Sequence, residues 1–449
     1  MSAELATRLP TPDSERPSLP VWVAFSILVL AVPAAVLTAY RPVTALVAFG
    51  LLALVFAATI RVQTALLFLI ASAPLEGAVD FSIGPGLTIT KLAGLLCFTS
   101  FALFATSSRR ALFLDRSHAI VFGLLGLALL SSLQAEELGP ALSTTLRYAS
   151  FVALYVVVSQ FVGDQTLQRK IAWTLSISST VAAVLGLWRL ASRDSFQATL
   201  ANADANDFAF MLAVTLPFTF WLLRERRVYR PAVIAMIGLI SVAIMLSFSR
   251  GALVGLAAGA VSHVLTERRH IPIMLFGALV ALIFALAFVH ERPGRVETGL
   301  MLKEKIATTN VETRLDAWKG AINLTTEHPL LGVGPGNFQF HYYEATGRPL
   351  GTPLLTVVHN AYLDVAAELG AIGMVLFLLY LIQALARLGV ARRRAYGPPG
   401  YAITVRTALV VAVVSGMFLS EQYFAPFWLF GGLATALWAE GLRSAATEA

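Results

Sequence analysis

The sequence predicts an all-α membrane protein, a polytopic bundle of transmembrane helices. Of its 449 residues, 57% are hydrophobic and only 13% are charged, and the mean hydropathy is +0.75. A soluble domain carries about a quarter charged residues and about 45–50% apolar residues. Because the apolar excess extends along almost the whole chain, the composition excludes a collagen, a disordered chain and an ordinary water-soluble enzyme.

Apolar runs near membrane-spanning length divide the chain. A spanning helix requires about 20 apolar residues, and several runs are shorter, so we expect about 12–14 spans. The candidate runs are 20–40, 43–60, 63–75, 89–106, 118–134, 141–161, 171–190, 206–223, 231–248, 250–266, 271–290, 370–388, 404–420 and 426–443. The predicted division is a polar tail at 1–19, transmembrane helices over 20–290, a polar segment over 291–357, a juxtamembrane helix and the last transmembrane helices over 358–443, and a tail at 444–449.

The charge pattern orients these spans. Basic residues gather in short clusters between the apolar runs, as at residues 392–394, and acidic residues such as Glu136 occupy alternate loops. Cytoplasmic loops are rich in Lys and Arg, so both termini are predicted to be cytoplasmic and segment 291–357 to lie on the outer face. Without a basic stripe or an aromatic platform, the positive charge indicates membrane lipid and not nucleic acid as the partner. The single cysteine, Cys97, excludes an intrachain disulfide.

The outer segment is too long for a simple connector, since loops beyond about 12–15 residues are usually functional or disordered. Residues 309–327 read as an amphipathic helix, with Val311, Leu315, Trp318 and Ile322 on one face. The Gly/Pro cluster at 330–338 allows close backbone approach to another group. A second helix is expected to begin near Thr356 and to continue into the span 370–388.

Three polar residues interrupt apolar surroundings. Arg250 lies at the outer end of a span, where it is either functional or a snorkelling anchor; the small residues after it would admit an anionic headgroup or a neighbouring helix. Arg314 lies on the first turn of the amphipathic helix, where it either serves the site or contacts Trp318 or a neighbouring acid. His359 is expected to open the second helix, where it is either structural or a proton acceptor near neutral pH.

These positions carry a family resemblance. The segments SFSRGALVGL (247–256), TRLDAWKGAINLTTEHPLLGVGPGNF (313–338) and HNAYLDVAAELGAIG (359–373) resemble, in order and spacing, the O-antigen ligase and polymerase family. The matching motifs cover about the last half of the chain. The resemblance implies a helical bundle of the membrane glycosyltransferase C type in the bacterial inner membrane, with a long periplasmic loop. A ligase is favoured over a polymerase of the same superfamily.

The resemblance also implies an activity. The donor would be a glycan on undecaprenyl diphosphate, the acceptor a hydroxyl of lipid A–core oligosaccharide or of another glycan, and the transfer inverting, with no metal and no cofactor. Arg250 and Arg314 match the family arginines and would hold the diphosphate, since a guanidinium binds phosphate oxygens bidentately. His359 matches the family histidine and would be the catalytic base or orient the acceptor hydroxyl.

Other polar residues are weaker candidates. Possible substrate-lining residues are Arg147, Arg189, Trp318, His328, Asn337, His341 and Asn360. Asn206 and Asp207 resemble helix caps. A flippase or transporter is the alternative from another class, but a transport path requires polar residues along the spans. These spans are nearly uncharged, which favours the enzyme.

Overall fold

The computed structural model describes residues 61–78, 88–108, 112–161, 163–192, 194–195, 197–224, 229–267, 312–349, 357–419 and 424–448. Every regular element in these ranges is a helix, so the predicted all-α class is confirmed. The predicted runs 20–40, 43–60 and 271–290 lie outside the described residues, as does Val311.

The helices follow the predicted apolar runs. They are α4 (Val62–Ser72), η1 (Ala73–Leu75), α5 (Ile89–Ser108), α6 (Arg116–Ser132), α7 (Leu138–Ser159), α8 (Gln165–Ser192), α9 (Ala205–Leu222), α10 (Arg230–Leu246), α11 (Arg250–Thr266), α14 (Tyr342–Thr346), α15 (Ala361–Arg393), α16 (Tyr401–Ser415) and α17 (Ala425–Glu448). A further helix occupies residues 312–327. Among the described helices, 5 are long and apolar enough to cross a membrane, and shorter apolar helices of 10–17 residues accompany them. The chain is therefore a multi-pass membrane protein.

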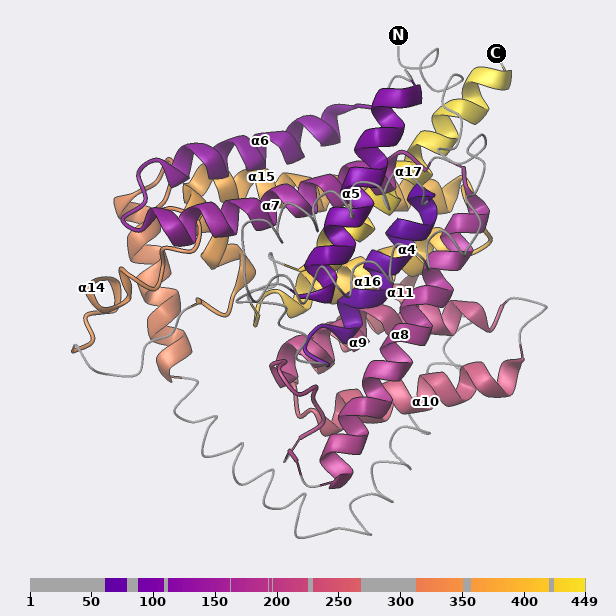
Figure 1. The fold of residues 1–449 in the computed structure, drawn as a ribbon, viewed down its shortest axis with the longest axis horizontal. Coiled ribbons are helices and arrows are strands. Elements are labelled where there is room, and N and C mark those ends of the chain that lie inside the picture. The colour runs from indigo at the N-terminus through magenta and orange to yellow at the C-terminus, as the bar shows by residue number, and fades with distance from the viewer. Residues whose placement is uncertain are drawn as a thin grey trace, which may run out of the picture.

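Helix α15 lies against α6, α16 and α17, and α7 packs on α6 and α17. In Figure 1, α6, α7 and α15 run side by side, and α14 lies beyond one end of them. Trp428 of α17 stacks on Tyr380 of α15 at 5.2 Å and on Phe151 of α7 at 6.1 Å between ring centroids. These large buried rings fix α15 in the bundle by dispersion and apolar burial.

Glycines let α11 pack closely on α16. A Cβ atom on Gly259 would lie 2.5 Å from the side chain of Val411, and one on Gly255 would overlap Ser415. Small residues at this spacing permit close approach of membrane helices. The sequence predicted that the small residues after Arg250 admit either an anionic headgroup or a neighbouring helix. The structure shows that they admit a neighbouring helix, α16.

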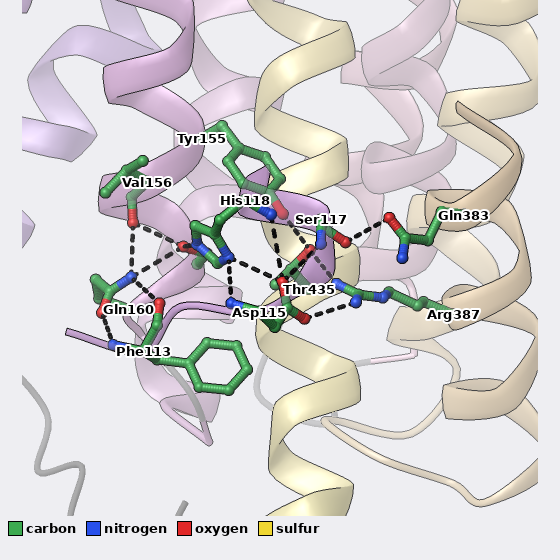
Figure 2. A network of polar contacts seen from close by, with 11 residues as sticks. Phe113, Asp115, Ser117, His118, Tyr155, Val156, Gln160, Gln383, Arg387 and Thr435 are labelled. Atoms are coloured by element: carbon green, nitrogen blue, oxygen red, sulfur yellow. Dashed lines mark hydrogen bonds and ion pairs between the residues drawn. The ribbon is translucent and has the colours of Figure 1, made fainter. Parts of the chain in front are cut away.

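A buried polar network ties four helices together at one end of the bundle (Figure 2). Asp115 caps α6 and accepts a hydrogen bond of 2.6 Å from Arg387 of α15. Arg387 also donates to Thr435 of α17 at 2.9 Å, and the Thr435 hydroxyl is bonded to Tyr155 of α7. Since Arg387 lies near the last turns of α15, this network is at the opposite end of that helix from His359.

The Gly/Pro cluster 330–338 docks on a break in α15. Gly370 has φ 72° and ψ 179°, which interrupts the helix between its first turns and its membrane-spanning part. There Val333 donates its backbone N–H to the carbonyl of Ala367 at 2.9 Å. A Cβ atom on Gly332 would overlap the backbone of α15. The close backbone approach predicted for the cluster is thus confirmed.

Candidate functional site

His359 lies just outside α15. The helix begins at Ala361, and Asn360 caps it by accepting two backbone N–H groups of the first turn at 3.1 and 3.2 Å. The prediction that this helix begins near Thr356 is wrong, because His359 has φ 56°, in the left-handed region. That conformation costs a non-glycine residue about 1–2 kcal/mol, and such residues cluster at functional sites.

The segment after α16, residues 416–419, anchors both the start of α15 and the helix 312–327. The carbonyl of Gly416 accepts a hydrogen bond of 2.8 Å from the backbone N–H of Ala361, two residues after His359. The carbonyl of Phe418 accepts a hydrogen bond of 3.4 Å from a guanidinium nitrogen of Arg314. Two segments that are far apart in the sequence therefore meet at this turn.

The start of α11 reaches the same turn. The Ser415 hydroxyl donates to the carbonyl of Gly251 at 3.3 Å, and a Cβ atom on Gly251 would lie 3.1 Å from that of Phe418. Arg250, the first residue of α11, is exposed, and Phe248 before it has φ 56°. Arg250, Arg314 and His359 thus belong to three segments held around one turn.

The imidazole of His359 is neutral at neutral pH. Its pKa is lowered to about 4, chiefly by burial and also by the positive charge of Arg314, while the carboxylate of Asp204 acts in the opposite direction. Burial also lowers the pKa of the Arg314 guanidinium from its ordinary value, again opposed by Asp204. The structure therefore brings a proton-accepting imidazole close to a partly desolvated guanidinium.

Asp204 is the residue of this site that the sequence did not single out. It lies before α9, and its carboxylate accepts a hydrogen bond of 2.7 Å from the backbone N–H of Asn206. The cap of α9 is therefore Asp204, and the assignment of that role to Asn206 and Asp207 is wrong. Its charge acts on both Arg314 and His359. Its position in a loop predicted to lie on the outer face was the only signal in the sequence.

The helix 312–327 presents a different face to the protein from the one predicted. Leu315 and Ile322 remain 47% and 50% exposed, whereas Ala317, Ala321 and Leu324 are buried. The small residues of the buried face let the helix approach α14, since a Cβ atom on Gly320 would lie 2.9 Å from Thr346. Hydrophobic periodicity marks large apolar residues and therefore missed a face built from alanine and glycine.

The sequence left open whether Arg314 serves the site or contacts Trp318 or a neighbouring acid, and the contacts in the structure decide between these alternatives. Asp316, a neighbouring acid, forms an ion pair of 2.5 Å with Arg348. Arg314 instead donates to the carbonyl of Phe418. The indole nitrogen of Trp318 is buried and has no hydrogen-bond acceptor among the described residues. The indole contributes packing to the small core beneath the helix.

Two of the weaker candidates have structural hydrogen bonds. Asn337 is 0% exposed. Its side chain accepts from the backbone N–H of Glu137 at 2.9 Å and donates to the carbonyls of Glu137 and Pro335, both at 3.2 Å. It therefore clamps the Gly/Pro cluster to the turn between α6 and α7 and does not line an open site. The side-chain oxygen of Asn360 is used by the cap of α15.

The remaining candidates are spread around the outer segment and the bundle. His341 lies 3.5 Å from a carboxylate oxygen of Glu136, and exposed His328 follows the last turn of the helix 312–327. Arg189 donates to the carbonyl of Thr199 at 3.4 Å. Arg147 is exposed, and its charge acts on the carboxyl of Glu76. In the part of the chain that the structure describes, no hydrogen bond or ion pair joins any of these four residues to the turn 416–419.

Comparison with known proteins supports the resemblance. Residues 235–378 match the family model described as O-antigen ligase. The matched region runs from α10 into α15 and includes Arg250, Arg314 and His359. No curated protein matches the chain. This match covers less than half of the chain, and together with the order of the motifs and the helical membrane fold it supports the superfamily of O-antigen ligases and polymerases, whose members transfer glycosyl groups.

Proposed function

We propose that this protein is an O-antigen ligase of the bacterial inner membrane, with both termini cytoplasmic. It transfers a glycan from undecaprenyl diphosphate to lipid A–core oligosaccharide at the periplasmic face. The observation that carries the proposal is the arrangement of Arg250, Arg314 and His359 in three segments anchored at the turn 416–419. Cations beside a neutral imidazole suit a reaction in which a diphosphate leaves and a hydroxyl attacks.

The two arginines act on the leaving group. As the bond between the anomeric carbon and the phosphate oxygen breaks, its electron pair moves onto the diphosphate. Preorganised donors that face developing charge in a water-excluded site are usually the largest catalytic contribution. Arg314 is partly buried, so its charge is screened less than that of a fully hydrated side chain. Arg250 is exposed, which leaves its guanidinium accessible to phosphate oxygens.

His359 acts on the acceptor. The acceptor oxygen attacks the anomeric carbon from the face opposite the diphosphate, which inverts its configuration, and the hydroxyl proton passes to a ring nitrogen of His359. A pKa of about 4 keeps the imidazole unprotonated before donor binding. The bound diphosphate neutralises Arg314 and adds negative charge, and both effects raise the imidazole pKa toward the value that suits a general base.

The test uses the purified full chain with a polyprenyl-diphosphate glycan as donor. His359→Ala is expected to slow transfer by about 10²–10⁴-fold, the usual contribution of a positioned base, while donor binding remains. Transfer at more than about a tenth of the wild-type rate would exclude His359 as the base.

The proposed role of Arg250 is tested by Arg250→Lys, which keeps the charge but loses the bidentate fork. Most of the transfer activity should therefore be lost. The matched control is Arg230→Lys. Arg230 is also the exposed first residue of an apolar helix, but it begins α10 at the end of the bundle away from Arg250. Equal losses in the two variants would contradict the assigned role of Arg250.

The acceptor separates ligase from polymerase. A ligase extends lipid A–core and leaves a second polyprenyl-linked glycan unextended, whereas a polymerase does the reverse. A protein that only moves lipid-linked glycan across vesicles, with no new glycosidic bond, would contradict both.

A further inference from the structure

A cavity lies at the opposite end of α15 from His359. Its volume is about 480 Å³, and it lies between the ends of α11 and α15 and the first turns of α16. The straight part of α15, from Gly370 to Arg393, is about 35 Å long at 1.5 Å per residue. That length exceeds the hydrocarbon thickness of a bilayer, about 30 Å. The cavity is thus separate from the site around residues 416–419.

Three arginines converge on this cavity: Arg392, Arg393 and Arg406. Arg392 lies close enough for its charge to act on Arg406. Arg406 donates a hydrogen bond of 3.2 Å to the hydroxyl of Thr266, which is a neutral partner. In the described ranges, no carboxylate forms an ion pair with any of the three. The neighbouring acid, Glu267, is paired with Arg224 at 3.0 Å. The cavity therefore carries positive charge that the described residues do not neutralise.

Apart from the arginines and Thr266, the cavity wall is aliphatic and open. Leu265 and Leu385 line it, and Leu265 is 78% exposed. Gly389 also lines it, and a Cβ atom there would meet no heavy atom within 4 Å. Glycine inside a helix costs about 0.5–1 kcal/mol relative to alanine, and here no neighbouring helix uses the space that the glycine leaves. The cavity thus combines a cationic end, an apolar wall and an unfilled helix surface.

We propose that this cavity binds an anionic phospholipid, with its phosphodiester between the arginines and an acyl chain along the leucine wall. Guanidinium groups match phosphate oxygens in charge and geometry, and basic pockets between transmembrane helices are sites for anionic headgroups. The apolar wall distinguishes the ligand from free phosphate, which would gain nothing from it. In the proposed orientation, this lipid belongs to the cytoplasmic leaflet.

The bound lipid joins the helices that hold the distant site. Helix α11 begins at Arg250, α16 leads into the turn 416–419, and α15 begins two residues after His359. All three helices line the cavity with their other ends. Without a ligand, the guanidinium groups of the three arginines repel one another, whereas a phosphate placed between them attracts each of them. The lipid therefore stabilises the packing of the helices on which the site depends.

The experiment measures lipid retention by native mass spectrometry of the full chain in mild detergent, with phosphatidylglycerol and phosphatidylcholine offered separately. Phosphatidylglycerol should be retained preferentially. Each of Arg393→Gln and Arg406→Gln should weaken its retention about fivefold, the ratio that corresponds to about 1 kcal/mol per basic residue at an anionic surface. Gly389→Leu should weaken retention without a change in charge, because the side chain would enter the cavity.

The matched control is Arg394→Gln, since Arg394 is the next residue, is exposed and does not line the cavity. This variant should retain phosphatidylglycerol to the same extent as the wild type. Thermal unfolding of each variant checks that the chain is folded. Equal retention of the two lipids, unchanged retention in Gly389→Leu, or an equal loss in Arg394→Gln would each overturn the proposal. Stabilisation by inorganic phosphate to the same extent as by phosphatidylglycerol would show a free-phosphate site, and would overturn it too.

Discussion

Gly370→Ala is the most informative single substitution. The glycine adopts φ 72° and ψ 179°, a region essentially restricted to glycine, and a Cβ atom there would lie 2.7 Å from the backbone carbon and oxygen of Leu330. The clash cannot be relieved by a side-chain rotation, because the atoms that it meets are backbone. Backbone strain and overpacking each cost about 1–3 kcal/mol, so the expected loss in the free energy of unfolding is about 2–6 kcal/mol.

The structural consequence reaches the catalytic segment. To accept the methyl group, either the cluster 330–338 must leave α15 or the first turns of α15 must shift. The second movement displaces the residues that follow His359, and the first breaks the hydrogen bond of 2.8 Å from Ala371 to the carbonyl of Pro329. A misplacement of 1 Å can slow an enzyme by about 100-fold, so we expect transfer to fall by about that factor in protein that is still inserted.

The assay combines thermal unfolding in detergent with the rate of glycan transfer. The control is Gly126→Ala in α6, where a Cβ atom would meet nothing within 4 Å. That change should leave stability unchanged or raise it by up to about 1 kcal/mol, through helix propensity alone. A Gly370→Ala protein with wild-type unfolding and wild-type transfer would refute the inferred tight contact between the cluster and α15.

Four further outcomes are expected. Asn337→Ala removes the buried side chain that pairs with the part-buried backbone N–H and carbonyl of Glu137 and should cost about 1–3 kcal/mol in unfolding free energy, as measured by thermal unfolding; a change below about 0.5 kcal/mol would contradict the clamp. Arg387→Ala leaves His118 as the remaining side-chain partner of the Asp115 carboxylate and should cost about 1–3 kcal/mol, whereas the double variant with Asp115→Asn should recover part of that loss; a double variant no more stable than the single one would contradict the pairing. In pH–rate profiles, the acid limb of kcat/KM should fall near pH 4, where the His359 imidazole of the free enzyme gains its proton, and the limb of kcat should lie at higher pH. Asp204→Asn retains a capping side chain but removes the charge that raises the pKa of His359, so it should move the kcat/KM limb to lower pH; an unmoved limb would contradict the electrostatic contact.

The sequence predicted the elements of the site better than their arrangement. Arg250, Arg314 and His359 are recognisable because charged or titratable residues in apolar surroundings are uncommon. The turn 416–419 was missed because it contributes backbone carbonyls, which every residue carries. Asp204 was missed as a site residue because its effect depends on the distance between α9 and two segments far away in the sequence.

Local sequence patterns predicted the membrane spans but failed for the packed face of one helix and for the start of another. The apolar runs predicted the spans because hydrophobicity over about 20 residues is decisive in a bilayer. The same reasoning chose the wrong face of the helix 312–327, where Ala317 and Gly320 pack closely and Leu315 is exposed. The start of α15 was also misplaced, because the left-handed conformation of His359 is imposed by tertiary contacts and not by local propensity.

The clamp at Asn337 has a consequence for how such an enzyme diversifies. After the clamp, the chain stays in one small core as far as Ala345, which is 7% exposed, and re-enters that core at Val358, which is 0% exposed. His359, the proposed base, follows Val358 directly, so its position is set independently of the length of chain between Ala345 and Val358. Doubling the length of a loop costs only about 0.6 kcal/mol in closure entropy. Segment 346–357 is therefore where insertions can change the surface that, under the proposed function, faces the acceptor, while His359 stays in place.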